Sequence, residues 1–373
     1  MVLPTVYCDY WLWAKGQVHR LQQPSPFTQR TAVRGARLCL ARSWHHHDTL
    51  HSEYQPERNI AQMPSETPKG RGMTSRIVSA LLGTALLSLA AAGPAQAVII
   101  LDSTWADQGG AAGAEGDGFG AAKALAMEPQ FCAIMSFFDG EQIGGSGTWI
   151  GNDQDGTAYV LTAAHNFGDG NDPATWTYYT RAGTEFTAKA VHIHPNYDAN
   201  SDETPGYDMA IVELNGPVTD CDTPPLLYGG DDELGQRATM VGFGSRGIGS
   251  VGQDDKYYSS EDAAAARNII DVVEDPAPDG KGGNQLLVDF DSEDGSTNVF
   301  EDGNSLPVDE YEGVLGSGDS GGSLWIETDE GWAIVGVNAW GDDAVYGSTG
   351  GFGRISTQYD WVKSIFDANF TNE

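Results

Sequence analysis

Three side chains far apart in the chain are of the types that nucleophilic catalysis requires. His165 ends the apolar run YVLTAAH, Asp208 opens the run DMAIVEL, and Ser320 stands in the stretch GSGDSGGSLW. A serine hydroxyl becomes a good nucleophile when a base within hydrogen-bond reach takes its proton and a third group orients that base. Imidazole and carboxylate suit these two roles, so the three residues predict acyl transfer through a serine.

Glycines crowd around the candidate nucleophile. Four of the seven residues from 316 to 322 are glycine. Glycine is entropically costly to order, so this density indicates a turn that residues with a side chain cannot form.

Short β-type runs separated by turn clusters surround these positions. TAYVLTAA, DMAIVEL and GGSLWIE alternate with Gly-, Asn- and Asp-rich segments from about Phe131 onward, and this spacing is typical of antiparallel β structure. Near the end of the chain Trp361, Val362, Ile365 and Phe366 fall on one face of a helix. We therefore expect an all-β fold with one C-terminal helix.

A secretory signal is predicted well inside the sequence. Arg76 provides a positive start, residues 77–92 are apolar, and AQA at 95–97 is a small-x-small cleavage site, which makes Val98 the expected first exported residue. A membrane anchor is the alternative, but the apolar run is shorter than the ~20 residues that span a bilayer. The protein is therefore expected to be secreted.

The charge is concentrated after the predicted signal. The first 97 residues hold ten Lys and Arg and five Asp and Glu, which leaves ten and 48 for residues 98–373, a formal net charge of −38. Binding of nucleic acid or of an anionic membrane surface draws on Lys and Arg, so this balance argues against both partners.

Two cysteines, Cys132 and Cys221, remain after residue 97. Export favours oxidation, and we expect one disulfide between them, with two buried free thiols as the alternative.

No metal site or cofactor is predicted from the motifs. The acidic stretches DFDSEDG and NSDETPGYD leave a structural calcium open, but neither has the spacing of an EF-hand loop. Solvated acidic surface is the simpler interpretation of both stretches.

The motifs TAAH, DMAIVEL and GDSGG, in this order, resemble the three signatures of the trypsin/chymotrypsin-like serine proteases. The resemblance covers roughly residues 131–366 and implies two six-stranded antiparallel barrels with the active site between them. It implies a polypeptide substrate, His165 as general base, Asp208 as the group that orients it, and Ser320 as nucleophile.

The resemblance also assigns roles to the neighbours of the nucleophile. The N–H groups of Gly318 and Ser320 would form the oxyanion hole, and Asp319 would pair with a newly liberated N-terminal amine. No Arg-Ile-Val-Gly-Gly activation site is present, so this amine is either that of Val98 or that of Ala124 after cleavage at Lys123.

Counting back from the nucleophile gives a candidate specificity pocket of Val314, Leu315, Gly341 and Gly350. An apolar base cannot compensate a buried Lys or Arg, so an apolar or small side chain is expected before the scissile bond. The acidic loop EDGNSLPVDEYEG leaves a basic preference as the alternative.

The expected organisation follows from these assignments. It comprises a mis-assigned start or disordered leader (1–72), the signal peptide (73–97), a flexible or propeptide-like segment (98–123), a first β-barrel (124–225) and a second (226–373) with an acidic surface insertion at about 246–305. A monomeric secreted endopeptidase is the expected function. An inactive homologue that binds a partner through its cleft, and an esterase, are the alternatives.

Overall fold

The structure, a computed structural model, describes residues 98–111, 118–140, 142–167, 175–200, 205–257, 262–276 and 283–372. The expected leader and signal peptide lie outside these ranges. Within them the regular structure is mainly β, and none of the helices combines the length and the apolar character needed to cross a membrane.

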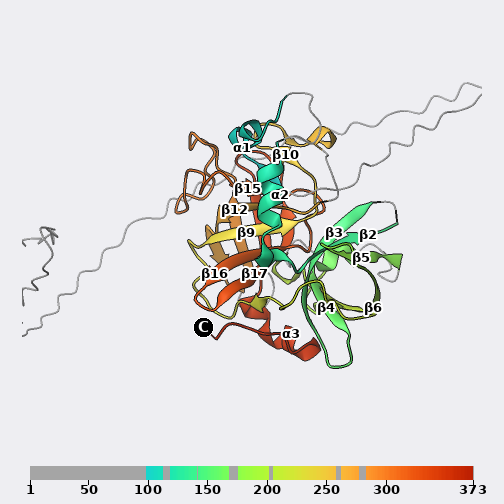
Figure 1. Cartoon of the computed structure of the whole chain (residues 1–373). Helices are drawn as coiled ribbons and strands as arrows, with labels where there is room; N and C mark the ends of the chain where they lie inside the picture. The colour runs from blue at the N-terminus through green and yellow to red at the C-terminus, as the bar shows by residue number, and fades with distance from the viewer. Residues whose placement is uncertain are drawn as a thin grey trace, which may run out of the picture. The chain divides into compact units, whose positions relative to one another are not determined.

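Six antiparallel strands close into a barrel in the first half of the described chain (Figure 1). The strands follow the order β2-β3-β4-β7-β6-β5 around the barrel. Their bounds are β2 (Ile134–Phe138), β3 (Ile143–Asn152), β4 (Ala158–Thr162), β5 (Thr177–Thr180), β6 (Glu185–Ile193) and β7 (Ala210–Leu214). Large side chains such as Trp149, Tyr178 and Val212 fill the interior.

The second half forms a strongly curved sheet in the order β12-β9-β16-β17-β18-β14-β13, and β8 pairs with β17. The strands are β8 (Leu226–Leu227), β9 (Arg237–Gly242), β12 (Ala264–Ile269), β13 (Val272–Glu274), β14 (Gln285–Asp289), β16 (Ser323–Thr328), β17 (Gly331–Gly341) and β18 (Thr349–Arg354). The two ends of this path, β12 and β13, are consecutive in the chain and are separated by a bend at Ile270 and Asp271. The expected second closed barrel is therefore a half-barrel: its two edge strands, β12 and β13, are joined by this short segment of chain but do not pair with each other.

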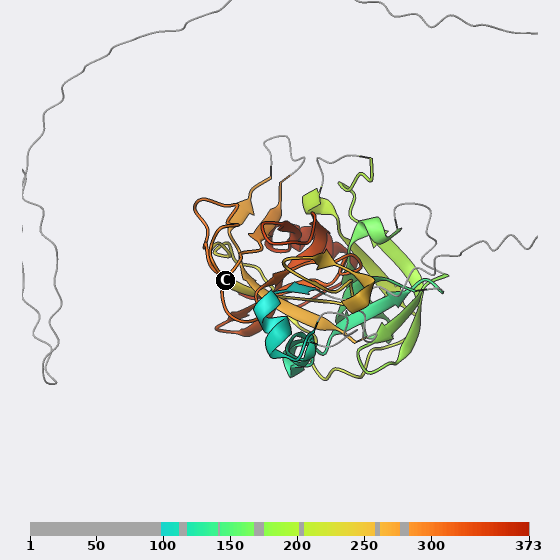
Figure 2. The same cartoon turned by 90° about the horizontal axis from the view of Figure 1, so that it is seen from above.

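The segment from residue 98 to 123, expected to be flexible, is instead packed where the structure describes it. A small sheet runs β11-β10-β1-β15, formed by β1 (Ile99–Ile100), β10 (Gly247–Ile248), β11 (Gly252–Gln253) and β15 (Gly313–Val314). Two helices follow β1, α1 (Asp102–Asp107) and α2 (Gly120–Ala126), and Figure 2 shows them in teal against the second barrel. Phe119 and Ala122 belong to the core of that barrel. The small residues that suggested flexibility allow close packing instead.

The predicted surface insertion is also wrong in part. The run AAARNI forms β12, which pairs along its whole length with β9. Ala264 and Ala266 are buried against α2 in the second core. An all-alanine run has no strand signature of its own, and pairing with β9 decides its conformation.

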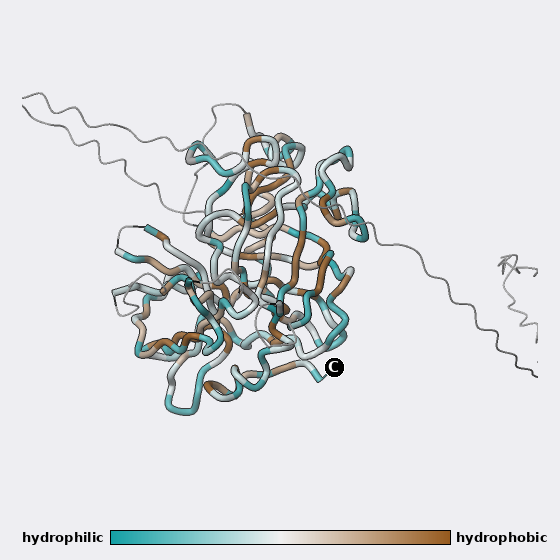
Figure 3. The backbone as a smooth tube through the Cα atoms, turned by 180° about the vertical axis from the view of Figure 1, so that it is seen from behind, coloured by the Kyte–Doolittle hydropathy of each residue, from teal (hydrophilic) through white to brown (hydrophobic). Residues whose placement is uncertain are grey.

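One apolar cluster joins the two barrels, and the hydrophobic runs along their strands are visible in Figure 3. Ile134 and Leu161 come from the first barrel, and Trp325 and Val337 from the second. The C-terminal helix α3 (Tyr359–Ile365) lies against the same cluster, as its predicted apolar face requires.

The predicted disulfide between Cys132 and Cys221 is present. It closes a loop with a sequence separation of 89 residues that contains all six strands of the first barrel. In the entropic model a loop of this length stabilises the folded state by ~4 to 5 kcal/mol.

Candidate active site

His165 and Asp208 meet at the ends of two paired strands. His165 lies in a 3-10 turn (Ala164–Phe167) after β4, and Asp208 lies just before β7, where Thr162 pairs with Ala210. The His165 Nδ1 atom is 2.5 Å from Asp208 Oδ2, and the His165 backbone N–H donates to Asp208 Oδ1 at 2.8 Å. A carboxylate at Nδ1 favours the tautomer that leaves Nε2 free to accept a proton.

The exposure of the two side chains suits a buried orienting group and an accessible base. The side chain of Asp208 is 9% exposed, whereas that of His165 is 36% exposed. The described part of the chain holds two further imidazoles with other contacts. His192 contacts Glu213 at 2.8 Å, and His194 stacks on Tyr207 while burial lowers its pKa to about 4.

Ser320 sits in a tight turn between β15 and β16. Gly318 and Gly321 have φ values of +91° and +84°, a conformation that residues with a Cβ rarely adopt. The Asp319 N–H closes the turn on the Gly316 carbonyl at 3.1 Å. Two of the glycines around Ser320 are therefore required by the positive φ values of this turn.

The Ser320 turn lies directly against the His165 turn. The Ser320 carbonyl accepts hydrogen bonds from Ser146 N–H at 2.8 Å and from the side-chain amide of Asn166, the residue after His165, at 3.1 Å. A Cβ on Gly321 would stand only 2.8 Å from the backbone nitrogen of Ala163. The segments that carry His165, Asp208 and Ser320 thus meet between the barrels.

Two backbone donors near Ser320 are available to a ligand. Across the described ranges, neither Gly318 N–H nor Ser320 N–H donates a hydrogen bond to the protein. The Gly318 carbonyl, by contrast, is held by the Ser146 hydroxyl at 3.0 Å. Two free N–H groups in one turn are what an oxyanion requires.

Asp319 points away from this turn into the interior and is fully buried. Its carboxylate accepts hydrogen bonds from the N–H groups of Val98 at 3.1 Å, Gly316 at 2.8 Å and Gly244 at 2.9 Å. Burial raises the pKa of Asp319 to about 6. Of the two N-terminal candidates, the structure places Val98 and not Ala124 at Asp319, because Ala124 lies within α2.

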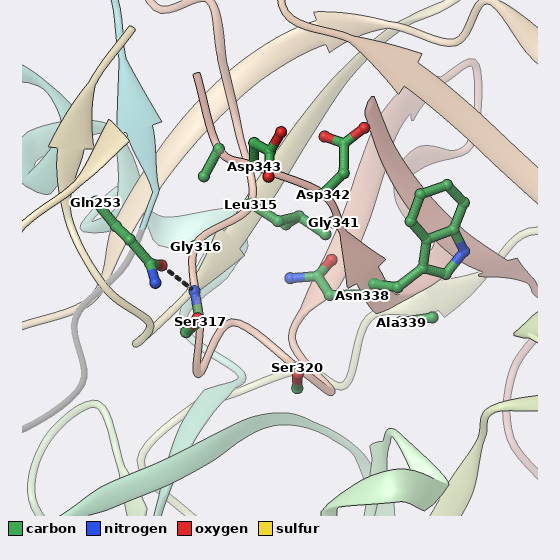
Figure 4. A pocket seen from close by; sticks show the side chains of 12 residues that line it. Gln253, Leu315, Gly316, Ser317, Ser320, Asn338, Ala339, Gly341, Asp342 and Asp343 are labelled. Atoms are coloured by element: carbon green, nitrogen blue, oxygen red, sulfur yellow. Dashed lines mark hydrogen bonds between the residues drawn. The ribbon is translucent and has the colours of Figure 1, made fainter. Parts of the chain in front are cut away.

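A cavity of about 480 Å³ opens beside Ser320 (Figure 4). Of the four residues expected in the specificity pocket, Leu315 and Gly341 line this cavity, whereas Val314 and Gly350 do not. Val314 is part of β15 and packs behind the cavity with Ile99. Counting along the chain found the right segment but could not show that Leu315, the residue after β15, lines the cavity while Val314 does not.

The cavity also has lining residues that the sequence did not indicate. Figure 4 shows Asp342 and Asp343 at the end of the cavity away from Ser320, beyond Leu315 and Gly341. Asp342 accepts hydrogen bonds from the backbone and side chain of Thr349 at 2.8 and 3.0 Å. Both carboxylates are solvent-exposed.

Other residues of the site carried no recognisable sequence signal. Ser146 and Asn166 bind the nucleophile turn from the first barrel. Asn338 binds it from β17, with its side-chain amide donating to the Asp319 carbonyl at 3.1 Å. Their roles depend on contacts between distant segments, which a single sequence does not reveal.

Comparison with known proteins gives two findings. The sequence model of the family described as "Trypsin-like peptidase domain" matches residues 145–337, just over half of the chain. Among solved structures the chain is similar to neuropsin, a serine protease expressed in the limbic system of mouse brain, at 19% identity over 64% of this chain and 96% of that one, with a TM-score of 0.46.

Proposed function

Since the chain belongs to the family of trypsin-like peptidase domains, we propose that it is a secreted, monomeric serine endopeptidase that cleaves polypeptides through an acyl-enzyme. The observation that carries the proposal is the His165–Asp208 pair at 2.5 Å, lying against the Ser320 turn with its two free N–H groups.

The proposed reaction assigns one step to each group. The Ser320 hydroxyl adds to the peptide carbonyl carbon while His165 Nε2 takes its proton, and the N–H groups of Gly318 and Ser320 bind the resulting oxyanion. His165 then gives the proton to the departing amine as the C–N bond breaks. Water, deprotonated by the same imidazole, hydrolyses the ester and restores Ser320. Asp208 stabilises the imidazolium throughout.

A fluorophosphonate probe tests the proposal directly, because it phosphonylates an activated serine. Protein processed to begin at Val98 is expected to gain one covalent label, detected by mass, and the Ser320→Ala variant none. Ser317→Ala is the matched control in the same turn and should label normally. Failure of the processed protein to label would favour a binding protein with an inactive site, and turnover of esters without proteolysis would favour an esterase.

We further propose that apolar or small P1 side chains are preferred and that acidic ones are rejected. Leu315 supplies apolar lining, while Asp342 and Asp343 face the far end of the cavity. A Glu side chain placed there would meet like charges, so kcat/KM for a Glu-anilide should be about tenfold or more below that for a Leu-anilide. Faster cleavage of an Arg-anilide than of Leu- and Ala-anilides would contradict the apolar preference.

We propose that cleavage of a single peptide bond both releases the protein from its signal and activates it. Removal of the predicted signal between Ala97 and Val98 would leave a free amine at the position that already contacts Asp319 at 3.1 Å. A disulfide accords with an oxidising compartment. Export would then produce the active enzyme without a separate propeptide.

A further inference from the structure

Four buried carboxyl groups gather around the loop that precedes β15. Asp271 occupies the bend after β12, Asp289 ends β14, and Asp291 and Glu312 lie at the two ends of the loop; their exposures are 8%, 0%, 0% and 0%. The Asp271 N–H donates at 2.9 Å to the carbonyl of Leu287, two residues before Asp289 in β14, and the Asp291 N–H donates to Glu312 Oε1 at 3.4 Å. The expectation of a solvated acidic surface is therefore wrong for Asp289 and Asp291 of DFDSEDG, whereas Glu293 and Asp294 of the same stretch are exposed.

The loop itself supplies amide groups to this cluster. The Asn304 backbone N–H donates to Asp271 Oδ1 at 3.3 Å, and its side-chain amide donates to Asp291 Oδ2 at 3.0 Å. The Val299 N–H donates to Asp289 Oδ2 at 2.6 Å. One oxygen of each aspartate is thus anchored to the protein.

The other oxygens have no donor. In the part of the chain that the structure describes, five buried oxygens here lack a hydrogen-bond partner: Asp271 Oδ2, Asp289 Oδ1, Asp291 Oδ1, Asn298 Oδ1 and Asn304 Oδ1. Asp289 and Asp291 are completely buried, so bulk water does not reach their free oxygens. Leaving a buried acceptor unpaired costs ~1 to 3 kcal/mol, and more when the group is charged.

Cationic side chains on the adjacent strands are engaged elsewhere. Arg267 of β12 pairs with Asp309 at 2.9 Å, and Arg237 of β9 contacts the same carboxylate at 3.7 Å. The cluster is therefore an electrostatically unfavourable arrangement of acceptors without a positive charge.

We propose that Asp271, Asp289 and Asp291, together with the side-chain oxygens of Asn298 and Asn304, bind one Ca²⁺ ion. The donors are all oxygens, and Ca²⁺ accepts six to eight such ligands in flexible geometry, including amide oxygens. No group of three or more acidic, His or Cys side chains in the described ranges is already arranged to hold a metal. The carboxylates must therefore draw together, and the two amides and water complete the shell. Glu312 stays outside it, since both its oxygens accept backbone N–H groups.

The ion would stabilise the substrate site through the chain that follows the loop. Glu312 is followed at once by β15, which pairs with β1 beside Val98. Leu315, which lines the cavity, comes next. Calcium removal is therefore expected to loosen the segment between the loop and the nucleophile turn.

Thermal unfolding of processed protein carrying Ser320→Ala, which prevents self-digestion, tests the site. After chelation and dialysis at pH 8, millimolar Ca²⁺ is expected to raise Tm by about 5 to 10 °C, the shift expected for an ion present at about 100 times its Kd. Equilibrium dialysis should find one tightly bound Ca²⁺ per chain. Asp289→Asn should abolish both effects, whereas Asp302→Asn, an exposed carboxylate of the same loop, should retain them.

Salt could raise Tm simply by screening the large negative net charge. NaCl of equal ionic strength and Mg²⁺ serve as the controls for this effect. An equal Tm shift with either salt, or with Ca²⁺ in Asp289→Asn, would overturn the site. The site would also be overturned if Ca²⁺ did not change Tm and Tm rose when the pH was lowered from 8 to 6. The carboxyl groups of the cluster would then be stabilised by protons and not by an ion. Should Asp289→Asn not fold, Asp291→Asn and the dialysis stoichiometry decide.

Discussion

Replacing Ser320 with alanine is expected to lower kcat for peptide hydrolysis by about 10⁶-fold, the loss seen when a serine protease loses its nucleophile. The variant keeps the turn, because Asp319 and the glycines that shape it are unchanged, so substrate should still bind with similar KM. The measurement is steady-state hydrolysis of a Leu-anilide by protein that begins at Val98. Residual turnover would come from binding and the oxyanion donors alone.

A comparison of the single and double variants of Ser320 and His165 tests whether the imidazole is the base for the serine. His165→Ala should lose about as much activity as Ser320→Ala, and the double variant no more than either, because the two side chains act in one step. His192→Ala is the matched control, since that imidazole contacts Glu213 at 2.8 Å on the strand pair β6–β7. Losses that multiply in the double variant would show that His165 is not the base for Ser320.

The local motifs were enough to predict the fold class and the residues that meet. Apolar runs of strand length predicted β4, β7 and β16, and the apolar face around Val362 predicted α3. His165 and Asp208 could be paired from sequence because each ends or precedes a strand and because the motifs TAAH, DMAIVEL and GDSGG, in this order, resemble those of a known family. The prediction of one disulfide followed from two cysteines alone.

The errors arose where contacts between distant segments decide the structure. The Gly- and Ala-rich stretch at 107–122 made the whole segment 98–123 appear flexible, yet Ile99 and Ile100 are held between β10 and β15. The buried position of Val314 likewise depends on that pairing and not on its distance from Ser320. The buried carboxylates of DFDSEDG were mistaken for surface because composition carries no information about burial.

The most consequential of these contacts is the one between Val98 and Asp319. In the uncleaved chain Val98 has φ +55°, an unfavourable conformation for a β-branched residue. Its N–H already donates to a fully buried carboxylate. Cleavage before Val98 removes the preceding carbonyl, relieves this conformation and replaces a neutral donor with a positive charge. The processed terminus should therefore hold Asp319, and with it the Gly318–Ser320 turn, more firmly.

Retention of a single extra residue at this terminus is expected to lower kcat/KM by about 10²- to 10³-fold, the range for loss of one oxyanion donor. Two proteins are compared, one released from a fusion to begin at Val98 and one that keeps Ala97. Both retain the β1 pairing and the Val98 N–H, so the difference isolates the charge and the relief of strain. Asp319→Asn in the first protein should produce a similar loss, because it removes the anion from the same pair.

The pH dependence gives an independent readout of this pair. A free α-amine has an ordinary pKa of about 7.7 to 8.0, and a buried anionic partner raises it. The stabilisation by the amine is then fully present below its ordinary pKa and is lost as the pH rises through the raised value, so the Val98 protein should lose kcat/KM on an alkaline limb. The protein that keeps Ala97, whose Val98 nitrogen cannot ionise, should lack that limb. Equal activity of the two proteins, or an exported enzyme that begins at Ala124, would show that Val98 is not the activating terminus.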